Sequence, residues 1–310
     1  MKCTVTGCAG FIGSNLVDRL LALGHQVVGI DNFSTGKHEF LEQALKSARF
    51  ALHDIDLAYE SLTSAITGCD VVFHLAANAD VRLGLSHPTK DLEQNVIVTS
   101  NVLEAMRTAG VKRVVFSSTG SVYGEAAVIP TPEDVSFPVQ TSLYGASKLA
   151  AEGLISAYCQ GYGFSGLVFR FVSILGERYT HGHVVDFYRQ LKEHPGYLNV
   201  LGDGTQRKSY LYVQDCVDAV LLANEHVGQE EFFVANLGTD EVCSVKDSVM
   251  LLCKHMGLSP EIRYSGGPRG WVGDNPFIHL RCDKMRALGW CPKLTIKESL
   301  QKTFQYLEKS

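Results

Sequence analysis

The sequence lacks several features that would place it in a specialised class of protein. No apolar run approaches the roughly 20 residues that a membrane-spanning helix needs. There is no repeat, low-complexity tract or long linker in the 310 residues. The net charge of −5 argues against nucleic acid or an anionic membrane surface as a partner. Because a β-type run begins directly after Met1, we expect no signal peptide and a cytoplasmic location.

The nine cysteines form neither a CxxC pair nor a cluster with histidine. An odd number of scattered thiols is typical of reduced cysteines in the cytosol rather than of a disulfide framework. His181 and His183 stand two apart, but no carboxylate or third histidine lies near them in the sequence. We therefore expect no metal site.

The opening stretch has a definite pattern of glycines. A β-branched run over residues 2–6 is followed by Gly7, Gly10 and Gly13, and then by leucine and valine at helical spacing. Strand, glycine turn and helix in this order form a phosphate cradle, in which the helix N-terminus offers free N–H groups to an anion. The triplet alone could also be an ordinary glycine-rich turn.

Asp31 favours the dinucleotide interpretation, because it ends a second β-type run at the expected place. A carboxylate there accepts hydrogen bonds from the adenosine ribose hydroxyls and repels a 2′-phosphate, so the predicted cofactor is NAD rather than NADP. Small residues after the fourth strand would let the dinucleotide pass close to the backbone. Besides the three glycines and Asp31, the residues expected at NAD are Phe11, Ile12, Asn32, Ser34, Thr35, Gly36, Asp54, Ile55, Leu75, Ala76, Ala77, Asn95 and Ser117.

Two of these side chains have a structural alternative. Asp54 would either accept from the adenine amino group or cap the next turn. Asn95 lies in a helix expected over residues 89–109, where it would either touch the strand behind the nicotinamide or be exposed.

Apolar β-type runs alternate with helical patterns as far as residue 171. This alternation predicts an α/β fold with a Rossmann-type, doubly wound parallel sheet and right-handed crossovers. We expect an NAD-binding domain over residues 1–172, to which residues 209–237 return, and a smaller mixed α/β substrate domain over residues 173–310. Within the returning segment we expect a strand over residues 210–213 and a helix capped by Asp215.

The expected chemistry lies where the fifth strand ends. Thr119 stands in a hydroxyl-rich stretch, and Tyr144 and Lys148 follow four apart, so a helix projects both to one face. An ammonium group beside a phenol lowers the phenol pKa, and a nicotinamide cation lowers it further, which gives a general base near neutral pH. Tyr188 and Lys192 have the same spacing but no such strand end upstream, so we interpret them as an ordinary surface pair.

Together these motifs resemble the extended short-chain dehydrogenase/reductases, and most closely the UDP-glucose 4-epimerase type of nucleotide-sugar epimerase. The resemblance implies that Tyr144 is the acid and base at the sugar 4-hydroxyl, that Lys148 holds the nicotinamide ribose and that Thr119 bridges the sugar and the tyrosine. Tightly bound NAD would take a hydride from C4 and return it to the other face of the 4-keto sugar. The family also suggests a homodimer through helices near residues 95–106 and 144–158.

The resemblance assigns further residues to the nucleotide sugar, with departures from the family pattern. A serine replaces the usual asparagine at position 173, Lys208 falls where an arginine usually binds the diphosphate, and Trp271 takes another familiar arginine position. Asp274 would meet a ribose hydroxyl or structure its loop. The residues expected at the substrate are Ser118, Thr119, Ser173, Arg207, Lys208, Arg269 and Asp274.

The expected reaction is epimerisation at C4 of a UDP-hexose such as UDP-glucose, UDP-galactose or a uronic or N-acetyl relative. Gly120 and Ser121 stand where related 4,6-dehydratases carry an Asp-Glu pair, and this favours epimerisation over elimination. A nucleotide-sugar dehydratase or 4-ketoreductase is the alternative enzyme. A non-catalytic NAD-sensing protein is the alternative outside enzymes, although such a protein has no reason to keep Thr119, Tyr144 and Lys148 in register.

Overall fold

A computed structural model describes residues 1–310 except 79, 81–83, 85, 137, 138 and 228–230. Its centre is a seven-stranded sheet with the order β11-β6-β5-β4-β1-β2-β3, in which every neighbouring pair is parallel. The predicted doubly wound parallel sheet is therefore confirmed. The strands are β1 (Lys2–Thr6), β2 (Gln26–Asp31), β3 (Phe50–Asp54), β4 (Val71–His74), β5 (Arg113–Thr119), β6 (Ser165–Phe171) and β11 (Phe232–Leu237).

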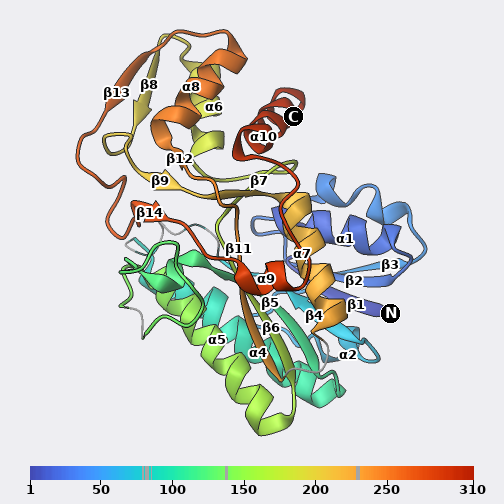
Figure 1. Cartoon of the computed structure of the whole chain (residues 1–310). Helices are drawn as coiled ribbons and strands as arrows, with labels where there is room; N and C mark the ends of the chain where they lie inside the picture. Colours follow the sequence, from blue (N-terminus) through green and yellow to red (C-terminus); the bar gives the residue numbers. More distant parts are fainter. Residues whose placement is uncertain (79, 81–83, 85, 137–138, 228–230) are drawn as a thin grey trace.

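Helices cover both faces of this sheet (Figure 1). The helices α1 (Phe11–Ala22) and α7 (Val213–His226) contact each other on one face, while α2 (Thr63–Ile66), α4 (Val98–Ala109) and α5 (Leu143–Tyr162) cover the other. Two apolar cores correspond to the two faces, with Leu16 and Val217 in one and Met106 and Ile155 in the other. The chain approaches α4 through α3 (Pro88–Asp91) and a π-helical stretch, η4 (Leu92–Ile97).

The chain order reverses between β1 and β4, because β1 pairs with β2 on one side and with β4 on the other. Connections leave in opposite directions at such a point, so a crevice opens at the carboxyl ends of these strands, and dinucleotides bind there in doubly wound folds. The sheet topology thus selects one edge of the molecule for the search for a site.

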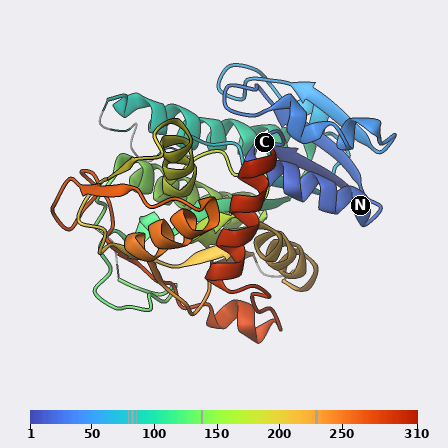
Figure 2. The same cartoon turned by 90° about the horizontal axis from the view of Figure 1, so that it is seen from above.

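Elements from the second half of the chain lie above this sheet in Figure 1. The last helix packs against two helices and two strands of this upper part and crosses the middle of the view in Figure 2. These elements are β7 (Ser173–Leu175), α6 (His183–Glu193), β8 (Tyr197–Val200), β9 (Arg207–Lys208), β10 (Tyr210–Tyr212), β12 (Cys243–Ser244), α8 (Val245–Met256), β13 (Glu261–Tyr264), β14 (Phe277–Ile278) and α10 (Ile296–Lys309). Short helices complete the chain at η1 (His38–Leu41), η2 (Ala44–Lys46), η5 (Gly120–Tyr123) and α9 (Asp283–Ala287).

The strand expected over residues 210–213 is present as β10, whereas the expectation that Asp215 caps the next helix is wrong. The strand β10 pairs with β7 in a separate two-stranded sheet, and the segment's contribution to the main sheet is β11. Asp215 does not cap α7, which begins at Val213. Its Oδ2 instead accepts from the backbone N–H groups of Lys293 (3.0 Å) and Leu294 (3.2 Å), so it ties a distant part of the chain to this helix. The division into domains over 1–172 and 173–310 stays a prediction.

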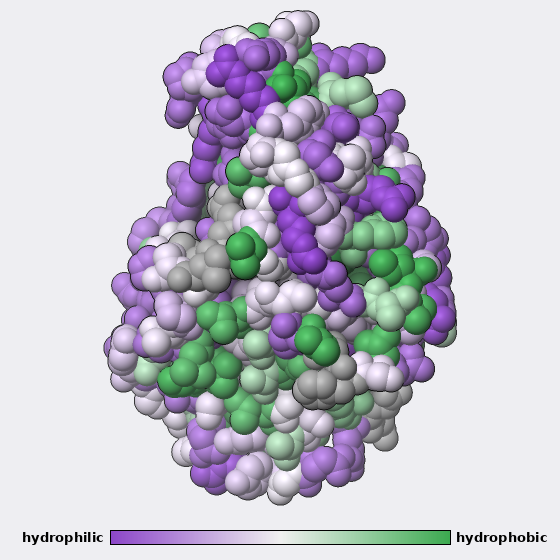
Figure 3. Space-filling model, turned by 90° about the vertical axis from the view of Figure 1, so that its left-hand side faces the viewer, coloured by the Kyte–Doolittle hydropathy of each residue, from purple (hydrophilic) through white to green (hydrophobic). Residues whose placement is uncertain are grey.

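None of the helices in the described parts of the chain combines the length and apolar composition that crossing a bilayer requires. On the face in Figure 3 the upper part is mainly hydrophilic, and the larger apolar patches lie in the lower half.

Candidate active site

The glycine turn between β1 and α1 is packed too closely for side chains. Gly7 has a φ of +69°, and a Cβ on it would lie 2.7 Å from the backbone nitrogen of Ala76. A Cβ on Gly13 would lie 2.0 Å from the carbonyl oxygen of Gly7. Gly10 is the N-cap of α1 and has no side chain to cap the first turn. The N–H groups of the turn itself, from Gly7 to Gly10, are bonded within the protein, and no side chain caps the first turn of α1. The N–H groups at the start of α1 are therefore the ones that could meet a pyrophosphate.

Asp31 organises the neighbouring loop. It is 9% exposed, and its two oxygens accept from the backbone N–H groups of Ala9 (2.8 Å) and Phe33 (2.9 Å). Burial raises the pKa of the Asp31 carboxyl, although both hydrogen bonds act in the other direction. Asn32 accepts from the Ser34 hydroxyl (2.7 Å) and backbone N–H (3.1 Å), and Thr35 and Gly36 complete the loop.

The end of β3 lies beside this loop, since Asp31 and Asp54 are paired in register. Asp54 is exposed there, and half-buried Ile55 follows it. The carboxylate that caps the following turn is that of Asp56, whose Oδ1 accepts from Ala58 N (2.9 Å). The capping alternative for Asp54 is therefore wrong.

The segment after β4 is held by buried polar groups. Thr6 Oγ1 accepts from the N–H groups of Leu75 and Ala76, both at 3.2 Å. His74 bridges Thr6 (2.8 Å) and Thr99 (3.1 Å) with its two ring nitrogens, and burial lowers its pKa to about 3, so it is neutral. These contacts set the path of residues 75–77 beside the glycine turn.

Asn95 is 1% exposed, so the exposed alternative is wrong. Its Oδ1 accepts from Asn78 N (2.9 Å), and its Nδ2 donates to Ser147 Oγ (2.8 Å). It therefore connects the segment after β4 with the helix that carries the Tyr144–Lys148 pair. The loop over residues 80–87 lies partly outside the described residues.

The structure brings Thr119, Tyr144 and Lys148 together at the carboxyl end of β5. The helix α5 starts at a capping serine, Ser142, which places Tyr144 in its first turn. The Tyr144 hydroxyl is hydrogen-bonded to the Thr119 side chain. Lys148 is 2% exposed, and its Nζ donates to the carbonyl oxygen of Ser117 (2.9 Å) and lies 4.7 Å from the centre of the Phe116 ring.

Burial controls the protonation of this pair. It raises the pKa of Tyr144 to about 12, against the lowering effect of the hydrogen bond with Thr119. Burial also lowers the pKa of Lys148 to about 7, while the negative charges of Glu152 and Asp91 act to raise it. The expected net lowering of the Tyr144 pKa is not met by the chain's own groups, because desolvation is the largest effect on that pKa and raises it.

Ser118 has a framework role that the expectation of substrate contact missed. It is 3% exposed, and its hydroxyl donates to the buried carboxylate of Glu152 on α5, which forms an ion pair with Arg170 of β6 (2.7 Å). Successive side chains of a strand point to opposite faces, so Ser118 cannot share the direction of Thr119. That alternation was a sequence signal for this arrangement.

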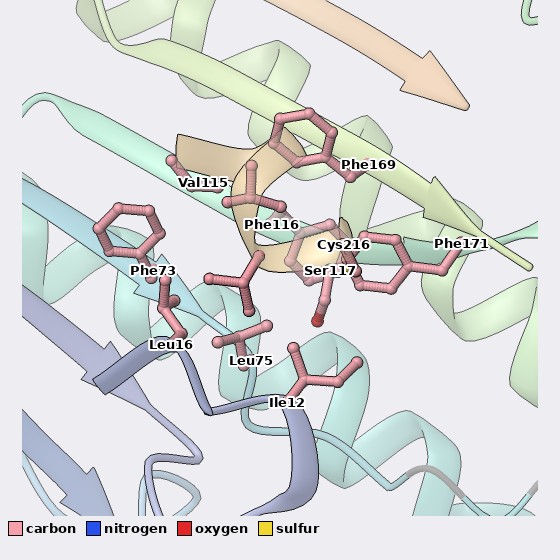
Figure 4. A pocket seen from close by; sticks show the side chains of 12 residues that line it. Ile12, Leu16, Phe73, Leu75, Val115, Phe116, Ser117, Phe169, Phe171 and Cys216 are labelled. Carbon is pink, nitrogen blue, oxygen red and sulfur yellow. The ribbon is translucent and has the colours of Figure 1, made fainter. Parts of the chain in front are cut away.

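An apolar pocket lies between the sheet and the helices α1 and α7 (Figure 4). At one end Ile12, Leu75 and Ser117 approach one another from three segments, with the serine hydroxyl directed toward the other two. All three are among the residues expected at NAD. A dinucleotide with its phosphates at the start of α1 would place its ring end near these three side chains.

Three of the residues expected at the substrate meet in the upper part of the molecule. Lys208 Nζ pairs with Asp274 Oδ1 (2.8 Å) and lies 5.0 Å from the Trp271 ring. Asp274 is 3% exposed and its Oδ2 accepts from Gly270 N (3.0 Å), which fits its alternative of structuring the loop. Arg269 forms an ion pair with Glu125, in the stretch that follows η5.

Of the four remaining residues expected at the substrate, Ser118 and Thr119 lie at the end of β5, and Arg207 and Ser173 have other surroundings. The guanidinium of Arg207 stacks at 4.4 Å from the centre of the Phe277 ring, and Ser173 is exposed at the start of β7. Among the described residues, no group of three or more histidine, cysteine, aspartate or glutamate side chains is placed to hold a metal ion.

Comparisons with known proteins agree with this geometry. A family model described as NAD dependent epimerase/dehydratase family matches residues 3–238. The UDP-glucose 4-epimerase of Mycolicibacterium smegmatis is 35% identical over 316 residues, which cover 99% of this chain and 98% of the relative. A crystal structure of UDP-galactose 4-epimerase is 40% identical with a TM-score of 0.88, covering 100% of this chain and 99% of the other. The UDP-glucuronic acid 4-epimerase of Bacillus cereus, in complex with UDP-glucuronic acid and NAD, is 28% identical with a TM-score of 0.92 and the same coverage.

Proposed function

Because the chain belongs to the NAD dependent epimerase/dehydratase family, we propose that it is an NAD-dependent enzyme that inverts C4 of a nucleotide-linked hexose. The observation that carries the proposal is the Thr119–Tyr144–Lys148 arrangement at the carboxyl end of β5. The substrate class is a UDP-hexose, of the kind named for the relatives: UDP-glucose, UDP-galactose or a uronic relative.

The cradle residues position the cofactor. The glycine turn and the N-terminus of α1 hold the pyrophosphate, and Asp31 accepts from the adenosine ribose. Ile12, Leu75 and Ser117 enclose the nicotinamide end. When bound, NAD supplies a hydride acceptor that is regenerated in each cycle, so the reaction needs no second redox substrate.

Tyr144 is the acid and base for the sugar 4-hydroxyl. Its phenol removes the hydroxyl proton when C4 is oxidised and returns a proton when C4 is reduced. Thr119 donates a hydrogen bond to the phenol oxygen and orients it toward the sugar. Lys148 contributes positive charge beneath the ribose, anchored to the Ser117 carbonyl. Lys148 is buried, whereas Thr119 and Tyr144 are half-buried, so the hydroxyl groups stay accessible to a sugar.

The substrate diphosphate lies at Lys208 and Arg269, the cations of the upper cluster. Both are paired with carboxylates, so a diphosphate that binds them exchanges one anion for another. Gly120 and Ser121 provide no carboxylate directly after Thr119, which supports epimerisation over dehydration. We further propose a homodimer through α4 and α5, supported by exposed Ile97 just before α4 and exposed Tyr162 at the end of α5. We also propose a cytoplasmic location, supported by nine free thiols.

The test replaces the proposed acid and base. Tyr144→Phe should lose at least about 10²-fold in kcat for a UDP-hexose, the lower end of what acid–base catalysis contributes, while NAD binding and circular dichroism stay as in wild type. Tyr188→Phe is the matched control, because Tyr188 and Lys192 repeat the spacing on α6 away from β5, and it should remain active.

Mass spectrometry of the products separates the alternatives, since an epimer keeps the substrate mass and dehydration loses water. A Tyr144→Phe enzyme that epimerises at the wild-type rate would refute the assignment.

A further inference from the structure

Asp91 is a buried carboxylate to which the proposed chemistry gives no role. It is 1% exposed and stands at the end of α3, where the helix passes into the π-helical stretch η4. Such stretches are rare and frequently lie at functional sites. Its Oδ1 accepts from Asn78 Nδ2 (2.8 Å), whereas Oδ2 has no hydrogen-bond partner among the residues that the structure describes.

A chain of hydrogen bonds leads from Asp91 to the proposed acid and base. Asn78 donates its side-chain amide to Asp91 and its backbone N–H to Asn95 Oδ1 (2.9 Å). Asn95 donates to Ser147 Oγ (2.8 Å), and Ser147 donates to the carbonyl oxygen of Tyr144 (2.8 Å). A displacement of Asp91 would therefore also shift the first turn of α5, which carries Tyr144.

The free oxygen is covered by Gly84. A Cβ on Gly84 would lie 3.0 Å from Asp91 Oδ2 and 3.3 Å from the Cβ of Leu143, the residue before Tyr144. The carboxylate is thus enclosed between this glycine and α5. Burying a carboxylate costs folding free energy, and within the described part of the chain only one of the two Asp91 oxygens is hydrogen-bonded. We therefore look for a role of its charge.

Nearby charges indicate what that role is. Among the residues that the structure describes, the charged groups that shift the pKa of Asp91 are Lys148, Lys90 and Asp80, and the charge of Asp91 in turn raises the pKa of Tyr144. Lys148 interacts with Asp91 from one side and with Glu152, one turn further along α5, from the other. Asp91 and Glu152 are therefore the two described carboxylates that raise the pKa of Lys148, the cation of the proposed chemistry.

We propose that Asp91 is a positioning residue of the Tyr144–Lys148 pair: its carboxylate orders Asn78 and Asn95 against α5 and keeps positive charge on Lys148. Removing the charge favours loss of the Lys148 proton, because Asp91 acts to raise the pKa of that ammonium group. It also lowers the pKa of Tyr144, since Asp91 opposes a phenolate there. The kinetic reading of this inference rests on the proposed function, but the titration of Lys148 does not.

The first experiment measures the titration of Lys148 directly. Protein labelled with ¹³Cε-lysine is followed by NMR from pH 5 to 9, roughly the range over which a lysine of lowered pKa titrates, and the Lys148 signal is identified by its loss in Lys148→Met. Asp91→Asn keeps an acceptor for Asn78 and removes only the charge. It should lower the Lys148 pKa by about one unit, the usual size for a close carboxylate.

The matched control is Glu93→Gln, which removes the same charge from an exposed position two residues along and should leave the Lys148 titration unchanged. An unchanged Lys148 pKa in Asp91→Asn would overturn the proposal. If Asp91→Asn does not fold, Asp91→Ser takes its place, and the same lowered pKa is required of it.

The second experiment follows the pH profile of kcat with a UDP-hexose. Asp91→Asn should move the whole profile to lower pH by about the shift seen for Lys148, whereas a merely structural role would lower kcat without moving the profile. A profile that stays in place would overturn the proposal. If the wild-type protein does not epimerise any UDP-hexose, the proposed function fails, while the NMR titration still decides the role of Asp91.

Discussion

The ion pair between Glu152 and Arg170 offers the sharpest stability test, because both side chains are buried and well bonded. Arg170 Nη2 and Nε contact the carboxylate at 2.7–3.2 Å, and the side chains are 12% and 5% exposed. Ser118 donates to the same carboxylate, and Arg170 Nη1 donates to the Tyr123 hydroxyl (2.8 Å). The pair therefore joins α5, β5 and β6 beneath the proposed catalytic residues.

The perturbation is Glu152→Gln, which keeps the shape and leaves the Arg170 guanidinium without its counterion. Breaking a buried pair in this way costs about 3–5 kcal/mol of folding free energy. The control is Glu261→Gln, which breaks a pair with Arg263 whose side chains are 64% and 49% exposed. An exposed pair contributes about 0–1 kcal/mol, so the two variants should differ severalfold.

Urea unfolding followed by circular dichroism at pH 7 measures both losses. The double variant Glu152→Gln/Arg170→Met should lose less than the two single variants added together, because it leaves no unpaired charge. If Glu152→Gln destabilises the protein no more than Glu261→Gln does, the buried carboxylate is not what neutralises Arg170, and the reasoning fails.

Two further predictions concern the glycine turn and acid stability. Gly13→Ala should destabilise the protein and abolish NAD binding in a fluorescence titration, because its Cβ meets the Gly7 carbonyl at 2.0 Å. Normal NAD binding by Gly13→Ala would contradict the packing argument. The control is Gly161→Ala, which has nothing within 4 Å of its Cβ and should stabilise α5 by about 0.5–1 kcal/mol. The pKa of His74 falls by burial from 6.5 to about 3, so the unfolded chain takes up a proton that the folded protein refuses. The free energy of unfolding therefore does not suffer from His74 above pH 6.5. As the pH falls from 6.5 toward 3, protonation of His74 in the unfolded chain lowers the free energy of unfolding by about 1.4 kcal/mol per pH unit. His74→Gln should show a flatter loss in urea midpoints over that range, and an identical slope would contradict the assignment.

Much of the fold and the centre of the candidate site could be predicted from local patterns. The spacing of Gly7, Gly10 and Gly13 predicted a turn that later proved too tight for side chains, since φ and close backbone approach act over a few residues. The four-residue spacing of Tyr144 and Lys148 and the position of Thr119 at a strand end likewise depend on helix and strand geometry alone. The alternation of side chains along a strand also predicts that Ser118 lies on the opposite face of the sheet from Thr119.

The partners of the buried charges could not be predicted in this way. Asp215 holds the backbone of Lys293, Glu152 neutralises Arg170 and Asp91 orders Asn78, and these pairings depend on how separate elements pack. The same holds for Tyr144, whose pKa burial raises to about 12 although a lysine lies one turn away. Short-range spacing decides which groups share a face, whereas desolvation and charge pairing depend on everything that surrounds them in space.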